Sequence, residues 1–294
     1  MTKDSNYINN KNNTVDMNKT ILHAIIPVAS ILLYGCNNDT HEPATEDKLP
    51  QVKSFVWSAA EGAPEQLAGL NEFDYDSDGR VILYSTPAQK TVYSYNGIHC
   101  NGVMTNTASG AKCQDQNFTF NKDGRPISEE STDFENGETC SAKFGYDDAG
   151  RLKKYEISLS NGNFKNCDLI YDSETGLLSE VKVLRRDSGE EMELIYRYEY
   201  TNRKNPVALY PECVHIIDNE PAFAFTGMDG YSRDLLPEKI TVSTDGVDAQ
   251  IFSFSYGFSD NGKLTSISET ASWLDEKGNV VMTVPAIQIT DIKY

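Results

Sequence analysis

Apolar and polar residues alternate along most of the chain beyond residue 50, with the period of two that is typical of β-strands. The alternation is clearest over 140–146, 155–159, 192–200 and 252–258, where Tyr, Phe, Leu, Ile and other apolar residues share one face. The residues between them are mainly Lys, Glu, Arg and Ser. One apolar face and one polar face are typical of antiparallel sheet, and no segment has a convincing helical period. The pattern therefore predicts an all-β protein.

A short motif recurs within this pattern. It has two aromatic residues two positions apart, then an acidic or amide residue, a Gly, and often Arg or Lys before an aliphatic residue. Clear copies begin at Phe73, Phe118 and Phe144, and weaker copies occupy 169–178, 198–207 and 256–264. The middle glycines of the series recur every 26 residues. The expected turn glycines are Gly79, Gly124, Gly150, Gly176 and Gly262.

Each copy is interpreted as a β-hairpin. Asp or Asn can hydrogen-bond its own turn, and Gly can adopt the positive φ that a tight reversal needs. A hairpin of this length has strands of about nine residues and cannot bury its aromatic face without neighbours. We therefore predict a single long antiparallel up-and-down meander of roughly 14–18 strands, which is too many to stay flat and should curl into a barrel-like or sharply curved sheet.

The segments 73–81, 118–125 and 144–152 resemble the tyrosine-aspartate (YD) repeats of large secreted proteins. They resemble more closely a family of bacterial lipoproteins of unknown function that have a porin-like fold. Together with the N-terminal segments described next, the resemblance covers nearly the whole chain. It implies a porin-like barrel and almost nothing about activity.

The N-terminal segments contain a predicted targeting signal. Residues 17–35 have a positive residue, Lys19, followed by a short apolar stretch, as in a secretory signal peptide. The stretch ends in Leu-Tyr-Gly before Cys36, which resembles a bacterial lipobox and implies lipid attachment at Cys36. An ordinary signal peptide with a chance Cys is the alternative. Residues 1–16 are Asn-rich and are interpreted as a mis-annotated N-terminal extension, with Met17 as the true start.

The next segment, 36–50, is acidic and polar with two Pro residues, and is expected to be a flexible tether. Acidic residues close behind a lipidated Cys resemble the export signal of some surface lipoproteins. We therefore expect an outer-membrane lipoprotein, on the cell surface rather than on the periplasmic face. Residues 51–294 are expected to form one β-meander domain.

Charge narrows the classes of partner. The 294 residues contain 26 Lys and Arg against 44 Asp and Glu, a net charge of −18, which repels phosphate backbones and excludes nucleic acid as a favoured partner. The expected partners are the membrane, through the N-terminal lipid, and a glycan or envelope protein.

Five cysteines remain besides Cys36. Cys100 and Cys113 flank a loop rich in Gly and Asn and are the expected disulfide pair, which an extracytoplasmic compartment would permit. The alternative is that all five are small core residues. No CxxC motif is present, so a zinc or redox site is not expected.

Candidate chemistry is sparse. Asp74, Asp76 and Asp78 resemble the opening of a calcium loop, but Ser85 occupies the position of the required bidentate Glu, and a hairpin turn explains the same residues. The acidic run 190–193 could supply a glycosidase pair by chance. Common hydrolase and phosphate-loop motifs are not found, and no cofactor is expected.

The sequence thus favours a non-enzymatic, lipid-anchored envelope protein that binds or scaffolds a glycan or protein. One alternative is an envelope hydrolase acting on glycans through a carboxylate pair. A less favoured alternative is an integral outer-membrane barrel, because both faces of the segment 125–134 are polar.

Overall fold

Each strand of this chain pairs with the strands before and after it in the sequence. The structure is a computed structural model that describes residues 50–59, 67–207, 209, 210, 212 and 234–294. The first eight strands are β1 Ser54–Ala59, β2 Gly69–Tyr75, β3 Val81–Ser85, β4 Gln89–Asn96, β5 His99–Asn106, β6 Lys112–Phe120, β7 Pro126–Asp133 and β8 Thr139–Tyr146. The others are β9 Leu152–Leu159, β10 Phe164–Tyr171, β11 Leu178–Asp187, β12 Glu190–Lys204, β13 Leu235–Thr244, β14 Val247–Phe258, β15 Leu264–Leu274 and β16 Val280–Lys293.

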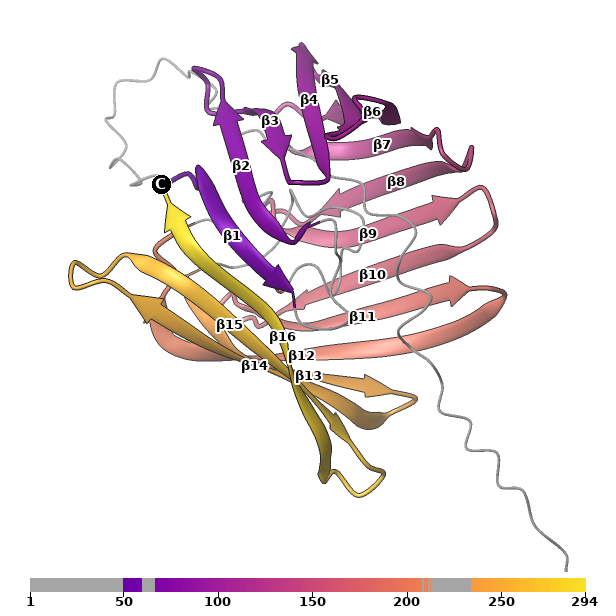
Figure 1. Ribbon diagram of the computed structural model, residues 1–294. Coiled ribbons are helices and arrows are strands. Elements are labelled where there is room, and N and C mark those ends of the chain that lie inside the picture. The colour runs from indigo at the N-terminus through magenta and orange to yellow at the C-terminus, as the bar shows by residue number, and fades with distance from the viewer. Residues whose placement is uncertain (1–49, 60–66, 208, 211, 213–233) are drawn as a thin grey trace, which may run out of the picture.

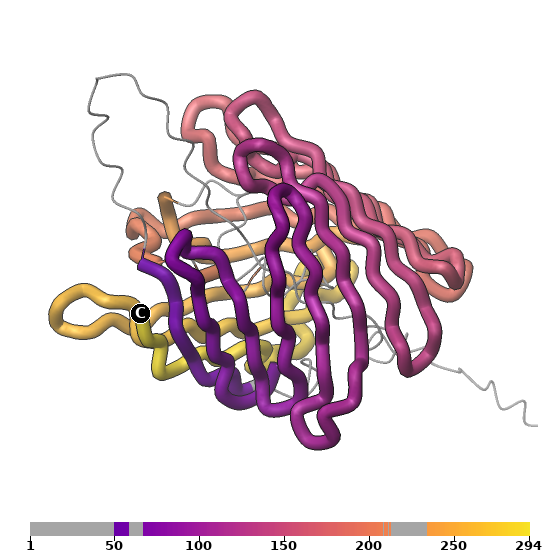
Figure 2. The backbone as a smooth tube through the Cα atoms, turned by 90° about the horizontal axis from the view of Figure 1, so that it is seen from above, coloured from indigo at the N-terminus to yellow at the C-terminus, as the bar shows by residue number. Residues whose placement is uncertain are grey.

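These strands, sixteen among the described residues, form a closed barrel (Figure 1). All pairings are antiparallel, and β16 closes the ring against β1 with Ser54 opposite Lys293 and Trp57 opposite Ile289. Figure 2 shows the strands following one another around the ring, from indigo β1 to yellow β16. The predicted all-β, up-and-down meander of roughly 14–18 strands is therefore confirmed, and the sheet closes completely.

The barrel has two rims that differ in their turns. The repeat rim carries the turns of the repeated motif, at 76–80, 121–125, 147–151, 172–177 and 259–263, together with the turn at 97–98. The opposite rim carries the turns at 86–88, 107–111, 134–138, 160–163, 188–189, 245–246 and 275–279. Because the number of strands is even, the start of β1 and the end of β16 both lie at the repeat rim.

The inward faces of the strands form one hydrophobic core. Phe55, Trp57 and Tyr155 are almost completely buried, as are most residues of the apolar alternation. Val207 and Leu209, from the connection between β12 and β13, are buried in the same core. Side chains therefore occupy the interior of the barrel.

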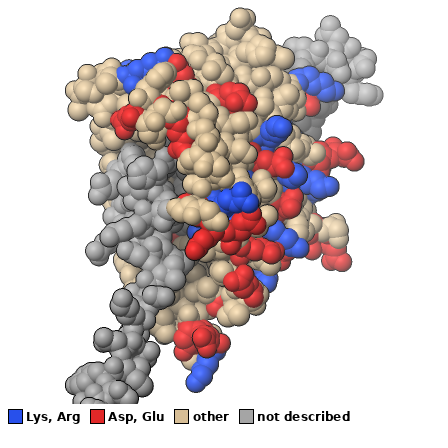
Figure 3. Space-filling view, turned by 90° about the vertical axis from the view of Figure 1, so that its right-hand side faces the viewer, with Lys and Arg blue, Asp and Glu red and all other residues tan. Residues whose placement is uncertain are grey.

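The outward faces of β8–β13 are mainly polar and charged, with Ile170 on β10 and Leu184 on β11 exposed among them. On β9 the ammonium group of Lys154 lies 2.7 Å from the carboxylate of Glu156. Further along the wall, Arg197 lies 3.2 Å from Asp248 and 3.6 Å from Glu180. On the side of the molecule drawn in Figure 3, acidic and basic side chains are interspersed. This wall therefore carries side chains of both charges.

In the part of the chain that the structure describes, no helix is long and apolar enough to cross a membrane.

Candidate functional site

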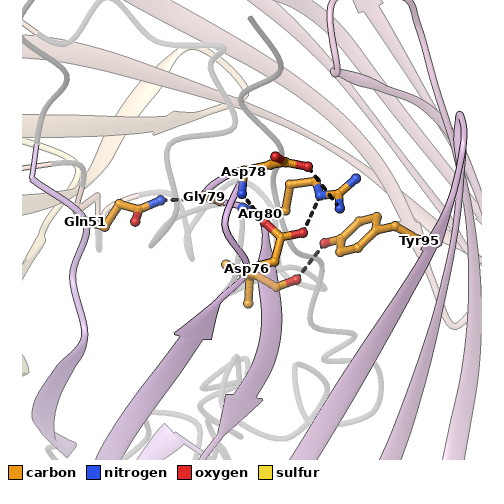
Figure 4. A network of polar contacts seen from close by, with 7 residues as sticks. Gln51, Asp76, Asp78, Gly79, Arg80 and Tyr95 are labelled. Carbon is orange, nitrogen blue, oxygen red and sulfur yellow. Dashed lines mark hydrogen bonds and ion pairs between the residues drawn. The ribbon is translucent and has the colours of Figure 1, made fainter.

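The repeated motif builds a polar network at each of its turns, shown for the first copy in Figure 4. Asp76 directly follows β2, and its Oδ1 accepts the backbone N–H groups of Asp78 and Arg80, both at 2.9 Å. Its Oδ2 accepts Nε–H of Arg80 at 2.5 Å. Gly79 has a φ of 81°, which explains why Gly occupies this position. The acid thus closes the turn and fixes the arginine.

Arg80 in turn contacts the next hairpin. Its guanidinium lies 4.7 Å from the centre of the Tyr95 ring, a cation–π contact. The Tyr95 hydroxyl donates to the carbonyl of Val81 at 2.6 Å. Gln51 donates from its side chain to the carbonyl of Gly79 at 2.8 Å, which attaches the residues before β1 to the same turn (Figure 4).

The network sets the charge state of its acid. Burial alone would raise the pKa of Asp76, but the backbone N–H and guanidinium groups of Arg80 and the N–H of Asp78 outweigh it and lower that pKa below the usual range. The same causes lower the pKa of Asp147, with Arg151 in the place of Arg80. Both acids are therefore held as carboxylates.

The third clear copy repeats the geometry of the first. Asp147 accepts the backbone N–H and the Nε–H of Arg151, both at 2.8 Å. The guanidinium of Arg151 lies 4.3 Å from the centre of the Tyr171 ring, and the Tyr171 hydroxyl donates to the carbonyl of Leu152 at 2.9 Å. The copies are thus equivalent structurally and not only in sequence.

Tyrosine hydroxyls link neighbouring hairpins around the repeat rim, and we call them the tyrosine ring. Each hydroxyl donates to a backbone carbonyl next to or within an earlier strand, at 2.5–2.9 Å. Phe120, at the corresponding end of β6, has no hydroxyl. The seven pairs are Tyr75–Val52, Tyr95–Val81, Tyr146–Pro126, Tyr171–Leu152, Tyr200–Leu178, Tyr256–Pro237 and Tyr294–Leu264.

The turn glycines singled out from the sequence lie at the repeat rim. All five have positive φ, between 70° and 81°, in the described turns. They are Gly79, Gly124, Gly150, Gly176 and Gly262.

The three acids compared with a calcium loop do not converge on one point. Asp74 lies exposed on β2, Asp76 closes the turn, and Asp78 lies 3.3 Å from the guanidinium of Arg80. Among the described residues, no group of three or more His, Cys, Asp or Glu side chains could hold a metal ion. The structure therefore uses this segment as a hairpin turn.

The expected disulfide is absent, because Cys100 and Cys113 are both free thiols. The prediction took the residues between them as one loop, but 99–106 form β5 and only 107–111 form the turn. Cys100 lies opposite Phe118, whereas Cys113 lies beside Gln114, which is opposite Met104. The offset of about five residues is about 16 Å along the strands, well beyond the reach of a disulfide.

Three of the cysteine thiols lie in the core. Cys100, Cys140 and Cys167 are at most 4 % exposed and belong to the hydrophobic core. Burial raises the pKa of Cys100 to about 12 and also raises the pKa of Cys140. Thiols of this kind are poor nucleophiles and poor metal ligands at neutral pH. Cys213 lies outside the described residues.

The acidic run 190–193 lies at the start of β12. Glu191 forms an ion pair with Arg186 across the β11–β12 hairpin, and Glu190 and Glu193 are exposed. Its carboxylates are therefore part of the charged outer surface.

Sequence reasoning did not identify the acids that lie inside the barrel. Glu129 on β7 and Glu269 on β15 are each 1 % exposed. Their strands are eight positions apart in the ring of sixteen, so the two acids lie on opposite walls. For Glu129 the missing signal is a register shift between Thr119 and Phe120, after which Glu129 and Ser131 face inward with Pro126.

The proposed N-terminal features, namely the extension 1–16, the signal peptide 17–35, the lipid attachment at Cys36 and the tether up to residue 49, lie outside the described residues.

The comparisons with known proteins agree with this geometry. A porin-like protein from Bacteroides uniformis superposes with a TM-score of 0.58 at 14 % identity, over 83 % of this chain and 99 % of that one. A porin-like protein from Bacteroides vulgatus gives 0.56 at 15 % identity, over 83 % and 98 % of the two chains. At these identities the likeness shows the fold alone. A search of the curated proteins found no match.

The family model described as Teneurin YD-shell matches residues 65–215, which run from before β2 to beyond β12 and include the three clear copies of the motif. This match extends over slightly more than half of the 294 residues. The chain therefore belongs to the Teneurin YD-shell family.

Proposed function

We propose that this protein is a lipid-anchored protein of the cell envelope whose barrel acts as a non-enzymatic binding or scaffolding module. The observation that carries the proposal is the charged outer wall of β8–β13. A wall that faces lipid needs an outward apolar band, whereas paired charges such as Lys154 and Glu156 suit a wall in water. A barrel of this kind needs a separate attachment to the membrane, and the sequence around Cys36 offers one.

The position of the N-terminus supports this arrangement. Gln51 is fixed to the turn at Gly79, so the described chain enters the barrel at the repeat rim. A lipidated Cys36 would be joined to that rim through the residues of the proposed tether. The opposite rim would then be directed away from the membrane, where a glycan or envelope protein can reach it.

The use of the polar residues supports a binding role rather than hydrolysis. Asp76 and Asp147 maintain turns, and Glu191 is paired with Arg186.

Metabolic labelling tests the anchor. We expect the wild-type protein to incorporate radiolabelled palmitate and Cys36→Ser to lose the label, while a control variant, Cys113→Ser, keeps it. Globomycin should block processing of the wild type. If Cys36→Ser remains in the membrane after a urea wash, the barrel itself is embedded and the proposal is wrong.

Protease treatment of intact cells tests the orientation. We propose surface display, so the barrel should be cleaved in intact cells under conditions that spare a periplasmic marker. Protection until the outer membrane is permeabilised would place the protein on the periplasmic face.

A further inference from the structure

We propose that Asn96 is a site of spontaneous deamidation, at which the backbone nitrogen of Gly97 converts the side-chain amide into a succinimide that water then opens. The products are aspartate and isoaspartate. The reaction gives the repeat rim a new negative charge after the protein has folded. The inference goes beyond the proposed function and depends neither on the lipid anchor nor on a binding partner.

The reaction consumes water and releases ammonia. The amide nitrogen of Gly97 loses its proton and attacks Cγ of Asn96, so a C–N bond forms while the Cγ–Nδ2 bond breaks and ammonia leaves. Water then hydrolyses one of the two carbonyl groups of the succinimide ring, and the ring nitrogen regains a proton. Attack at one carbonyl gives aspartate, and attack at the other gives isoaspartate. Gly is the most favourable residue after Asn, because it has no side chain to hinder the nitrogen.

The sequence alone does not select Asn96, because it contains five Asn-Gly pairs. Exposure does not select it either, since four of the five asparagines are exposed. The feature that separates the pairs is the hydrogen bonding of the attacking nitrogen and of the side chain it attacks. The five pairs are Asn96–Gly97, Asn101–Gly102, Asn136–Gly137, Asn161–Gly162 and Asn261–Gly262.

In four of the pairs the backbone N–H of the glycine is held by the fold. Gly102 lies inside β5, which pairs with β4 on one side and β6 on the other. The other three donate within their turns, at 2.8–3.0 Å, in the pairs Gly137–Asp133, Gly162–Leu159 and Gly262–Ser259. A nitrogen held in this way cannot approach Cγ without breaking its hydrogen bond.

The side chains of the same four asparagines are held as well. Each makes a hydrogen bond that must break before the side chain can rotate freely. The bonds, at 2.5–3.2 Å, are Asn101–Gln116, Asn136–Glu138, Asn161–Asn163 and Asn261–Ser259.

Asn96 and Gly97 lack both restraints. Asn96 ends β4 opposite His99, which begins β5, so only two residues form the turn between them. In such a turn the flanking pair makes the closing hydrogen bonds, which leaves the N–H of the first turn residue, Gly97, outside the ladder. In the part of the chain that the structure describes, neither this N–H nor the Asn96 side chain has a hydrogen-bond partner, and both residues are exposed.

The site adjoins the network of the first repeat. Tyr95 directly precedes it, with its ring 4.7 Å from the guanidinium of Arg80 and its hydroxyl bonded to the carbonyl of Val81. Isoaspartate adds a methylene group to the main chain just after Tyr95, so the pairing of residue 96 with His99 must change. We therefore expect the amides of 96–99 to exchange hydrogen faster in aged protein than in fresh protein.

Peptide mapping by mass spectrometry on the purified full chain tests the proposal. Samples are aged at neutral and mildly alkaline pH in water labelled with heavy oxygen, and are then digested at acidic pH. We expect Asn96 to be deamidated at least about tenfold faster than any of the other four asparagines, which corresponds to a modest difference in activation free energy. The rate should rise with pH, because the attacking nitrogen must lose its proton. The product should contain heavy oxygen and include isoaspartate.

Unfolding separates the effect of the fold from that of the sequence. In concentrated urea all five pairs should react at similar rates, because the restraints are lost. Asn96→Gln should abolish the reaction at this position, since the longer side chain would have to form a larger ring. Asn161→Gln is the matched control in another exposed turn, and it should leave the rate at Asn96 unchanged.

Two outcomes would overturn the inference. One is an equal rate at Asn96 and at Asn161 in the folded chain, which would mean that the hydrogen bonds of the turns give no protection. The other is a product at position 96 that contains aspartate without isoaspartate, which would mean that Gly97 takes no part. Neither outcome affects the lipid anchor, which palmitate labelling tests separately.

Discussion

At the level of single residues, the repeated motif divides its work among an acid, a glycine and an arginine. The acid closes the turn, the glycine permits its positive φ, and the arginine reaches the aromatic ring of the next hairpin. The second copy shows what the charge of the acid contributes. Asn121 accepts the corresponding backbone N–H groups, those of Asp123 and Arg125. The guanidinium of Arg125, however, lies 5.6 Å from the centre of the Tyr146 ring, against 4.3 Å between Arg151 and the Tyr171 ring. An amide closes the turn without fixing the guanidinium by an ion pair.

Asp147→Asn tests this division of work. At pH 7 we expect the variant to lose about 1–2 kcal/mol of unfolding free energy, because an amide cannot replace the charge-assisted bond to Arg151. The folded-state pKa of Asp147 is lowered, so its contribution is present above the usual Asp value of about 4 and is lost as the pH falls through the folded-state pKa. The difference between wild type and variant should therefore shrink on acidification.

Urea unfolding measured between pH 7 and pH 3 checks that expectation. Asp148→Asn removes a charge from an exposed residue of the same turn and should have little effect. If the difference in unfolding free energy between wild type and Asp147→Asn stays constant over this pH range, the carboxylate contributes nothing through its charge.

At the level of elements, the tyrosine ring joins hairpins that are otherwise connected only by the sheet. Tyr171, at the end of β10, contacts both the arginine and the carbonyl of the preceding hairpin. The ring therefore strengthens the contact between modules, which a repeat protein needs because no single module can bury its apolar face.

Replacement of Tyr171 separates the two contacts. Tyr171→Phe keeps the ring and loses the hydroxyl bond to Leu152, so we expect a loss of about 1 kcal/mol. Tyr171→Leu also loses the contact with Arg151 and part of the aromatic packing, so the loss should rise to about 2–3 kcal/mol. Thermal or urea unfolding measures both, and equal losses in the two variants would contradict the role given to the ring face.

The sequence predicted hairpins well because their causes are local. Alternation identifies the strands, and the Asp, Gly and Arg of each copy identify the turns at the repeat rim. Register shifts are not local, because they depend on which residues of two strands fit together. One such shift turned Glu129 inward, and Cys113 lies beside another, between Met104 and Thr105. The buried acids were missed where strands change register, whereas the disulfide was predicted wrongly because most of the supposed loop is strand β5.

At the level of the whole molecule, closure of the barrel depends on contacts between β1 and β16 that no local sequence pattern predicts. The sequence predicted a curved sheet but not its closure, because Ser54 and Lys293 meet across nearly the whole length of the domain. Burial explains why they meet. Ile289 on β16 is fully buried between Trp57 on β1 and Ile267 on β15, so an open sheet would expose this apolar row.

Truncation of a buried side chain where β16 pairs with β1, which we call the seam, should therefore lower the unfolding free energy strongly. We expect Ile289→Ala to lower the unfolding free energy by about 2–5 kcal/mol, the usual range for a large-to-small change in a core. Val281→Ala, at a side chain that is 63 % exposed on the same strand, should cost less than about 0.5 kcal/mol. Chemical denaturation gives both values, and a small effect of Ile289→Ala would mean that the seam contributes little to stability.

The meeting of both strand ends at the repeat rim has a consequence for engineering and for gene fusion. Because Ser54 and Lys293 are neighbours, a short linker could join them, and new termini could be cut at the turns of the opposite rim to give circular permutants. For the same reason the whole barrel could be inserted into a surface loop of a host protein without forcing the two halves of that host apart.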